Sequence, residues 1–193
     1  MKIIMIDNYD SFANTIAAYF TDAGADVTIY KSDCQIDVIG KVIADEKTDL
    51  IILGPGPNGP KDAGNYLEII KRFHKTIPIF GICLGFQTMM EYFGMPVKKL
   101  ENVMHGDSCI VEHCEKGIFK GIKKNEEFAR YNSLGVTDVP EYFEVTARSE
   151  NIIMAAKHKL LPIEGIQFHP ESLLSMQNEA GKKLIKNILI GLK

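Results

Sequence analysis

The sequence predicts an α/β fold: a single open, mostly parallel sheet flanked by helices, with a small antiparallel, β-rich insertion. In about the first half of the chain, continuous apolar runs alternate with segments of helical periodicity, which is typical of βαβ units on a sheet covered on both faces. After about residue 97, short segments of alternating apolar and polar residues indicate antiparallel or mixed strands. An amphipathic pattern at the end of the chain indicates a final helix.

The first half is expected to form strands that are each followed by a helix. The expected strands are residues 2–6, 26–30, 49–53 and 77–82. The expected helices span about residues 11–22, 36–46, 64–75 and 84–93. Such sheets place ligand sites beyond the carboxyl ends of their strands. Unusual residues follow three of these ends: Asp7-Asn8-Tyr9-Asp10, Gly54-Pro55-Gly56-Pro57 and Cys83.

The second half is expected to form shorter strands and one helix. The expected strands are residues 108–112, 126–131, 143–148, 152–157 and 163–168. The final helix is expected at about residues 177–192, with one apolar stripe made of Ala180, Leu184, Ile188 and Leu192. The chain shows no internal repeat, low-complexity tract or linker. We therefore expect a single domain over residues 1–193.

Composition excludes several classes of function. Of the 193 residues, 46% are hydrophobic and 24% are charged, which is typical of a globular protein and not of a disordered one. The net charge is −3 and the basic residues are scattered, so neither a nucleic acid nor a membrane is expected as a partner. No apolar run reaches the ~18 residues of a membrane span, and the short apolar start does not fit a signal peptide. We therefore expect a cytoplasmic protein.

Four cysteines are present, too few and too irregularly spaced for a disulfide scaffold. They are Cys34, Cys83, Cys109 and Cys114. No pair has C-x-x-C spacing, so neither a zinc site nor another metal site is expected. Reduced thiols are the default, and one of them is available for chemistry.

Cys83 lies in the pattern Gly81-Ile82-Cys83-Leu84-Gly85, directly between an expected strand and an expected helix. This pattern predicts a nucleophile elbow, in which small flanking residues allow a sharp turn that presents the side chain above the sheet. The positive end of the following helix favours a thiolate. The alternative is a buried cysteine that packs as a small hydrophobic residue.

His169 is the candidate base for this nucleophile, because it follows the apolar run at residues 163–168 and would emerge at the end of a strand. Glu171, two residues later, can orient its imidazole. The alternative is a surface histidine before a proline turn. His74, His113 and His158 lie among charged residues or on an expected exposed face, and we expect all three to be solvated.

The loop Gly54-Pro55-Gly56-Pro57 offers a glycine N–H to an oxyanion hole, with the N–H of Leu84 as the second donor. A phosphate-binding loop is the competing interpretation. It is disfavoured because prolines remove donors and no G-K-[ST] sequence follows.

Taken together, these residues resemble the triad (class I) glutamine amidotransferases, whose fold is flavodoxin-like. The resemblance is most specific to the small subunit, component II, of anthranilate synthase and of aminodeoxychorismate (para-aminobenzoate) synthase. Five ordered pieces between residues 7 and 172 carry it. They are Asp7-Asn8-Tyr9-Asp10-Ser11-Phe12; Gly54-Pro55-Gly56-Pro57; Gly81-Ile82-Cys83-Leu84-Gly85-Phe86-Gln87; Met104-His105-Gly106 with Arg130-Tyr131-Asn132-Ser133-Leu134; and Gly165-Ile166-Gln167-Phe168-His169-Pro170-Glu171-Ser172.

The resemblance implies a role for individual residues. Cys83 would be the nucleophile, His169 the acid and base, and Glu171 its orienter, with Gly56 and Leu84 as oxyanion donors. L-glutamine would be held by Gly56, Pro57, Asn58, Gln87, Ser133 and Leu134.

Three positions depart from the family pattern. Phe86 and Asn132 stand where most members have His, and Asn58 replaces a frequent Gly. We hypothesise that Phe86 and Asn132 touch and changed together; additive effects of restoring His at each would contradict this. All three departures leave the triad intact.

The resemblance also implies a partner. Glutamine hydrolysis releases ammonia, which a chorismate-using large subunit would consume to make anthranilate or 4-amino-4-deoxychorismate. Mg²⁺ would belong to that subunit, and no cofactor is expected in this chain. The assembly would be a heterodimer or a dimer of heterodimers, docked through Met104-His105-Gly106 and the loop after Asp7.

Three rival functions remain open. The chain could be a catalytically weak or silent partner-binding regulatory subunit, the amidotransferase subunit of another synthase such as GMP synthase, or a cysteine hydrolase that shares only the elbow. The choice between anthranilate and aminodeoxychorismate also stays open, because it depends on the partner.

Overall fold

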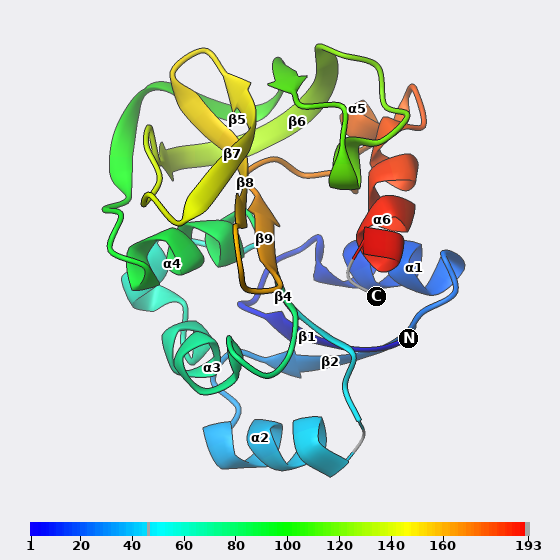
Figure 1. Cartoon of the computed structure of the whole chain (residues 1–193), viewed down its shortest axis with the longest axis vertical. Helices are drawn as coiled ribbons and strands as arrows, with labels where there is room; N and C mark the ends of the chain where they lie inside the picture. The colour runs from blue at the N-terminus through cyan, green and yellow to red at the C-terminus, as the bar shows by residue number, and fades with distance from the viewer. Residues whose placement is uncertain (46, 192–193) are drawn as a thin grey trace.

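The computed structural model describes residues 1–45 and 47–191 of the chain. In this part of the chain the strands form one nine-stranded sheet in the order β2-β1-β3-β4-β9-β8-β7-β5-β6 (Figure 1). The predicted α/β class is confirmed. The antiparallel strands extend the parallel sheet at one side, so the insertion is continuous with the main sheet.

The parallel part of the sheet contains five strands. They are β1 (Lys2–Asp7), β2 (Asp26–Lys31), β3 (Leu50–Leu53), β4 (Ile79–Ile82) and β9 (Ile163–Ile166). Strands β3, β4 and β9 are buried along their whole length, which explains their uninterrupted apolar sequences. Strand β9 pairs in parallel with β4 and antiparallel with β8, so this late segment completes the parallel half of the sheet.

Helices cover both faces of this parallel half (Figure 1). They are α1 (Ala13–Asp22), α2 (Ile36–Asp45), α3 (Tyr66–Phe73), α4 (Leu84–Tyr92), α5 (Leu173–Met176) and α6 (Ala180–Gly191), with 3₁₀ turns η1 (Pro60–Asp62) and η2 (Gly117–Phe119). Helices α1 and α6 pack on one core, and α2, α3 and α4 pack on the other. All the predicted helices are present, some shorter than expected.

The final helix differs from its prediction at its start. Glu179 has a φ of 57°, which a continuous α-helix does not allow. A short helix α5 therefore precedes α6, and the main helix begins at Ala180. Ala180, Leu184 and Ile188 are buried as the stripe predicted. Leu192 of that stripe, and Glu46 at the predicted end of the second helix, lie outside the described residues.

The antiparallel part contains β5 (Lys98–His113), β6 (Glu126–Gly135), β7 (Phe143–Ser149) and β8 (Ile152–His158). Strand β5 is much longer than predicted, because the segment before residue 108 continues its pairing with β6 through two register shifts. An isolated bridge joins Ala129 of β6 to His169, which follows β9. The antiparallel hairpin therefore reaches the edge of the sheet at which the parallel strands end. No described helix has the length and apolar character needed to cross a membrane.

Candidate active site

Cys83 lies at the sharp turn from β4 into α4, in a backbone conformation rare for a side-chain-bearing residue (φ 52°, ψ −102°). Its neighbours allow that turn. A Cβ added to Gly85 would lie 2.1 Å from the carbonyl oxygen of Leu53, and one added to Gly81 would lie 2.6 Å from the backbone nitrogen of Phe86. The Cys83 N–H donates to the Ile166 carbonyl, which ties the turn to the end of β9. The backbone geometry is that of a nucleophile elbow.

His169 and Glu171 form a buried pair just beyond the end of β9. The imidazole Nδ1–H donates to Oε1 of Glu171 at 2.6 Å, and both side chains are almost completely excluded from solvent. The His169 backbone is also held, because its N–H donates to Ala129 and its carbonyl accepts the Ser175 hydroxyl. Within the described residues, Nε2 of His169 has no hydrogen-bond partner. It is therefore available to exchange a proton.

Cys83 and His169 line the same cavity, of about 520 Å³. Burial by itself lowers the pKa of His169, but the negative charges of Glu171 and Cys83 outweigh burial and raise this pKa well above its usual value. The imidazolium form of His169 is therefore favoured in this cavity. Cys83 and His169 lie 86 positions apart in the sequence.

The two candidate oxyanion donors, Gly56 and Leu84, lie close together, and Gly56 lines this cavity. A Cβ added to Gly56 would lie 2.7 Å from Cβ of Asn8 and 2.8 Å from Cδ2 of Leu84, so a larger residue would have to displace these side chains. The Gly85 N–H donates to the Gly54 carbonyl at 3.2 Å and joins the loop to the start of α4. In the part of the chain that the structure describes, neither the Gly56 N–H nor the Leu84 N–H donates a hydrogen bond to the backbone.

The candidate glutamine-binding residues fall into two groups. Gly56 and Pro57 line the cavity, and exposed Asn58 has a φ of 64°, a left-handed conformation that asparagine adopts more readily than most residues other than glycine. Gln87 is buried and donates from Nε2 to the Leu134 carbonyl at 2.9 Å. Ser133, next to Leu134, is exposed. Contact of these residues with glutamine stays a prediction.

Aromatic rings surround the imidazole, although the sequence assigned them no role. The Tyr131 ring lies 5.0 Å from the His169 ring, and the Phe12 ring lies 5.6 Å from it. Tyr131 also shares a hydrogen bond with the Ser172 hydroxyl and packs edge-on against His105. Both aromatics belong to segments that carried the family resemblance, which is the signal that could have drawn attention to them.

Gln167 was also missed. Its side chain is buried, and its amide Nε2 lies 3.5 Å from Sγ of Cys83. Gln167 lies in the segment Gly165-Ile166-Gln167-Phe168-His169 that carried the family resemblance, which is the signal that could have drawn attention to it.

The prediction that His113 and His158 are solvated is wrong. Both are buried. His113 stacks on Phe119 with ring centroids 4.6 Å apart, and His158 packs against Phe143, its pKa lowered by burial and by the charge of His74. His74 itself is half-buried. The charged residues next to these histidines in the sequence did not indicate exposure, because adjacent residues of a strand point to opposite faces of the sheet.

Two other expectations concern contacts and metals. The ring of Phe86 packs over Gly165 of β9, where an added Cβ would lie 2.9 Å from Cδ2 of the ring. Asn132 donates from Nδ2 to the Leu134 carbonyl. The proposed contact between Asn132 and Phe86 stays a prediction. Among the described residues, no group of three or more His, Cys, Asp or Glu side chains is arranged to hold a metal ion.

Comparisons with known proteins show which sequences and structures this chain resembles. Residues 4–192 match the family model described as "Glutamine amidotransferase class-I". The chain is 41% identical to anthranilate synthase component 2 of Methanocaldococcus jannaschii, over 97% of this chain and 96% of that protein. It is also 41% identical to aminodeoxychorismate/anthranilate synthase component 2 of Bacillus subtilis, over 97% and 95%. Among solved structures, a putative GMP synthase component from Thermoplasma acidophilum superposes with a TM-score of 0.86 at 22% identity, covering 100% of this chain and 94% of that one. That last likeness shows the fold alone.

Proposed function

The chain belongs to the class-I glutamine amidotransferases, and we propose that it is the glutamine-hydrolysing subunit of a chorismate-using synthase. One observation carries the enzymatic part: a cysteine on a strained elbow shares a cavity with a buried His–Glu pair. The synthase part rests on the relatives that are 41% identical over nearly the whole chain.

In the first half-reaction, the Cys83 thiolate attacks the side-chain amide carbon of glutamine and forms a C–S bond. The oxyanion is held by the N–H groups of Gly56 and Leu84, and losing one such donor typically costs about 3 kcal/mol. The C–N bond then breaks as the His169 imidazolium donates its proton from Nε2 to the departing nitrogen. The products are ammonia and a γ-glutamyl thioester on Cys83.

In the second half-reaction, neutral His169 accepts a proton from water through Nε2, and the resulting hydroxide attacks the thioester carbon. The C–S bond breaks, glutamate leaves and the thiolate–imidazolium pair is restored. Glu171 holds Nδ1–H throughout, which keeps Nε2 facing the reaction and stabilises the imidazolium.

Substrate binding is assigned to residues around the cavity. Backbone groups of Gly56, Pro57 and Asn58 would hold one side of glutamine, and Gln87 with the Ser133-Leu134 backbone the other. The position of Gly56 and Pro57 on the cavity wall supports the first group, and the hydrogen bond from Gln87 to Leu134 supports the second.

Ammonia is mostly ammonium in neutral water, so a partner must receive it before it is protonated. The component 2 names of the relatives support the large subunit of a synthase in this role, in a heterodimer or a dimer of heterodimers. We expect that subunit to hold chorismate and Mg²⁺. Docking at Met104-His105-Gly106 and the loop after Asp7 is supported by His105 and residues 9–12, which line the cavity.

The test uses the glutamine analogue 6-diazo-5-oxonorleucine. We expect stoichiometric labelling of Cys83 that glutamine prevents, slow glutaminase activity of the chain alone, and faster activity when the large subunit is added. A silent regulatory subunit would leave Cys83 unlabelled. Full activity of the isolated chain would contradict the role of the partner. The product made by the reconstituted pair distinguishes anthranilate, aminodeoxychorismate and GMP synthases.

A further inference from the structure

A line of buried amides ends on the sulfur of Cys83. Nε2 of Gln87 donates to the Leu134 carbonyl at 2.9 Å and to Oε1 of Gln167 at 3.1 Å. Nε2 of Gln167 then donates to Sγ of Cys83 at 3.5 Å. Gln167 has no exposed surface, so it contacts the sulfur from within the protein and leaves the substrate side of the cavity open.

The polarity of this line is determined at its far end. A backbone carbonyl can only accept a hydrogen bond, so the Gln87 atom that faces Leu134 must be the amide nitrogen. The same nitrogen faces Gln167, whose oxygen must therefore point toward Gln87. As a result, the amide nitrogen of Gln167 points at Cys83, and the group beside the sulfur is a donor.

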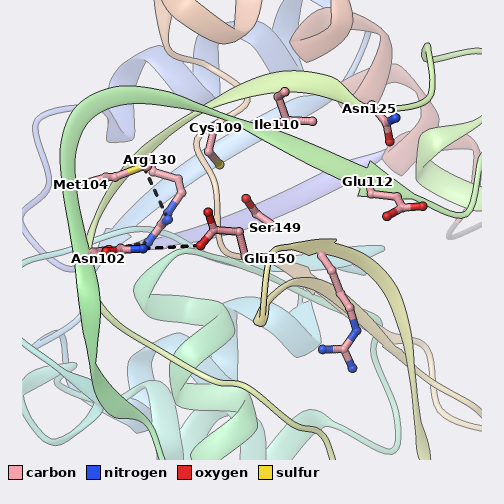
Figure 2. A pocket seen from close by; sticks show the side chains of 10 residues that line it. Asn102, Met104, Cys109, Ile110, Glu112, Asn125, Arg130, Ser149 and Glu150 are labelled. Carbon is pink, nitrogen blue, oxygen red and sulfur yellow. Dashed lines mark hydrogen bonds between the residues drawn. The ribbon is translucent and has the colours of Figure 1, made fainter.

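The Leu134 carbonyl is itself held in place. Asn132 donates to it from Nδ2 at 2.8 Å, and Arg130 donates from Nε to the amide oxygen of Asn132 at 3.0 Å. Figure 2 shows the buried Arg130 side chain on the wall of a second cavity, against Met104 and Asn102 of β5. The chain of bonds thus begins on the β5–β6 hairpin and ends at the elbow.

We propose that Gln167 is a further active-site residue, which stabilises and aims the Cys83 thiolate through its N–H···S hydrogen bond, with Gln87 as the positioning residue that orients it. The inference rests on the proposed function, because it takes Cys83 as the nucleophile. A hydrogen bond to an ionised acceptor is stronger than one to a neutral acceptor, so the donor favours the thiolate over the thiol. It also restrains a side chain whose backbone is strained.

The test measures how fast iodoacetamide alkylates Cys83 as a function of pH, by mass spectrometry of the peptide that contains it. In Gln167→Met, which keeps an unbranched side chain but loses the donor, we expect the midpoint of this profile to rise by about one pH unit. In Gln167→Glu, which places a negative charge beside the sulfur, we expect a larger rise. Gln87→Met should produce a smaller rise, because Gln167 keeps its donor but loses its orientation.

The matched control is Ile166→Val, which removes a buried methylene from the same strand and no polar atom. It should lower the melting temperature and leave the midpoint of the alkylation profile unchanged. The glutaminase kcat of Gln167→Met should fall about tenfold near neutral pH, with KM changed less than about twofold, because Gln167 does not contact substrate.

An unchanged midpoint in folded Gln167→Met or Gln167→Glu overturns the proposal. If Gln167→Met fails to fold, the midpoint in Gln87→Met decides: a rise supports the proposal and no change overturns it. Failure of the proposed function looks different. In that case wild-type protein shows no glutaminase activity, whereas the alkylation midpoint still depends on residue 167.

Discussion

Glu164 is a buried carboxylic acid that takes no part in the proposed reaction, and its removal makes a quantitative test of the structure. It lies on β9 opposite Lys157 of β8. Burial raises the pKa of Glu164 to about 7; the charge of Lys157 partly opposes this rise and that of Glu144 adds to it. The carboxyl group is therefore largely protonated in the folded protein at mildly acid pH.

The effect on stability follows from the difference between the folded pKa of about 7 and an ordinary value of 4.5. Between these values the folded state binds the proton and the unfolded state does not, so the free energy of unfolding falls as pH rises. The contribution of Glu164 to the free energy of unfolding is fully present below the ordinary pKa of 4.5, and it is lost as pH rises through the folded pKa of about 7. At about 1.4 kcal/mol per pH unit, the loss is about 3 kcal/mol.

The perturbation is Glu164→Gln, which cannot ionise. Relative to wild type, the variant should gain about 2.5 kcal/mol in free energy of unfolding between pH 5 and pH 8.5, or roughly 5–10 °C in melting temperature for a chain of this size. Thermal unfolding of both proteins across this pH range is the assay. Glu112→Gln is the control: this exposed carboxylate pairs with Lys124, and its loss should change stability by less than about 1 kcal/mol. A difference between variant and wild type that does not vary with pH would refute the reasoning.

Two further substitutions test the site and the elbow. Replacing Glu171 with Gln removes a negative charge that raises the pKa of His169, so that pKa should fall, the active pH range should shift downward, and kcat should drop by roughly 10²-fold or more. A pH–rate profile of glutaminase activity measures this, and an unchanged profile would mean that Glu171 does not act on the imidazole. Gly85→Ala places a Cβ 2.1 Å from the Leu53 carbonyl oxygen and should cost about 2–4 kcal/mol of stability by thermal unfolding. Gly191→Ala, where an added Cβ meets no described residue within 4 Å, should be nearly neutral, and equal losses in the two variants would contradict the packing account.

The parts of the fold that were predictable depend on local patterns. Uninterrupted apolar runs identify buried parallel strands, and helical periodicity identifies the helices that cover them. The elbow was also predictable, because a strand-to-helix turn as sharp as the one at Cys83 leaves no room for a Cβ at Gly81 or Gly85. His169 and Glu171 are close in sequence, so their hydrogen bond follows from local geometry as well.

Amino-acid order alone was enough to identify the strands, the helices, the elbow and the His–Glu pair, because each depends on residues a few positions apart. It could not place β9 beside β4, bring Gln167 to the sulfur of Cys83, or bury His113 and His158. Those outcomes depend on which distant strands pair and in which register. Pairing and register are settled by the packing of the whole core, because a shift of one residue would turn every side chain of a strand to the opposite face.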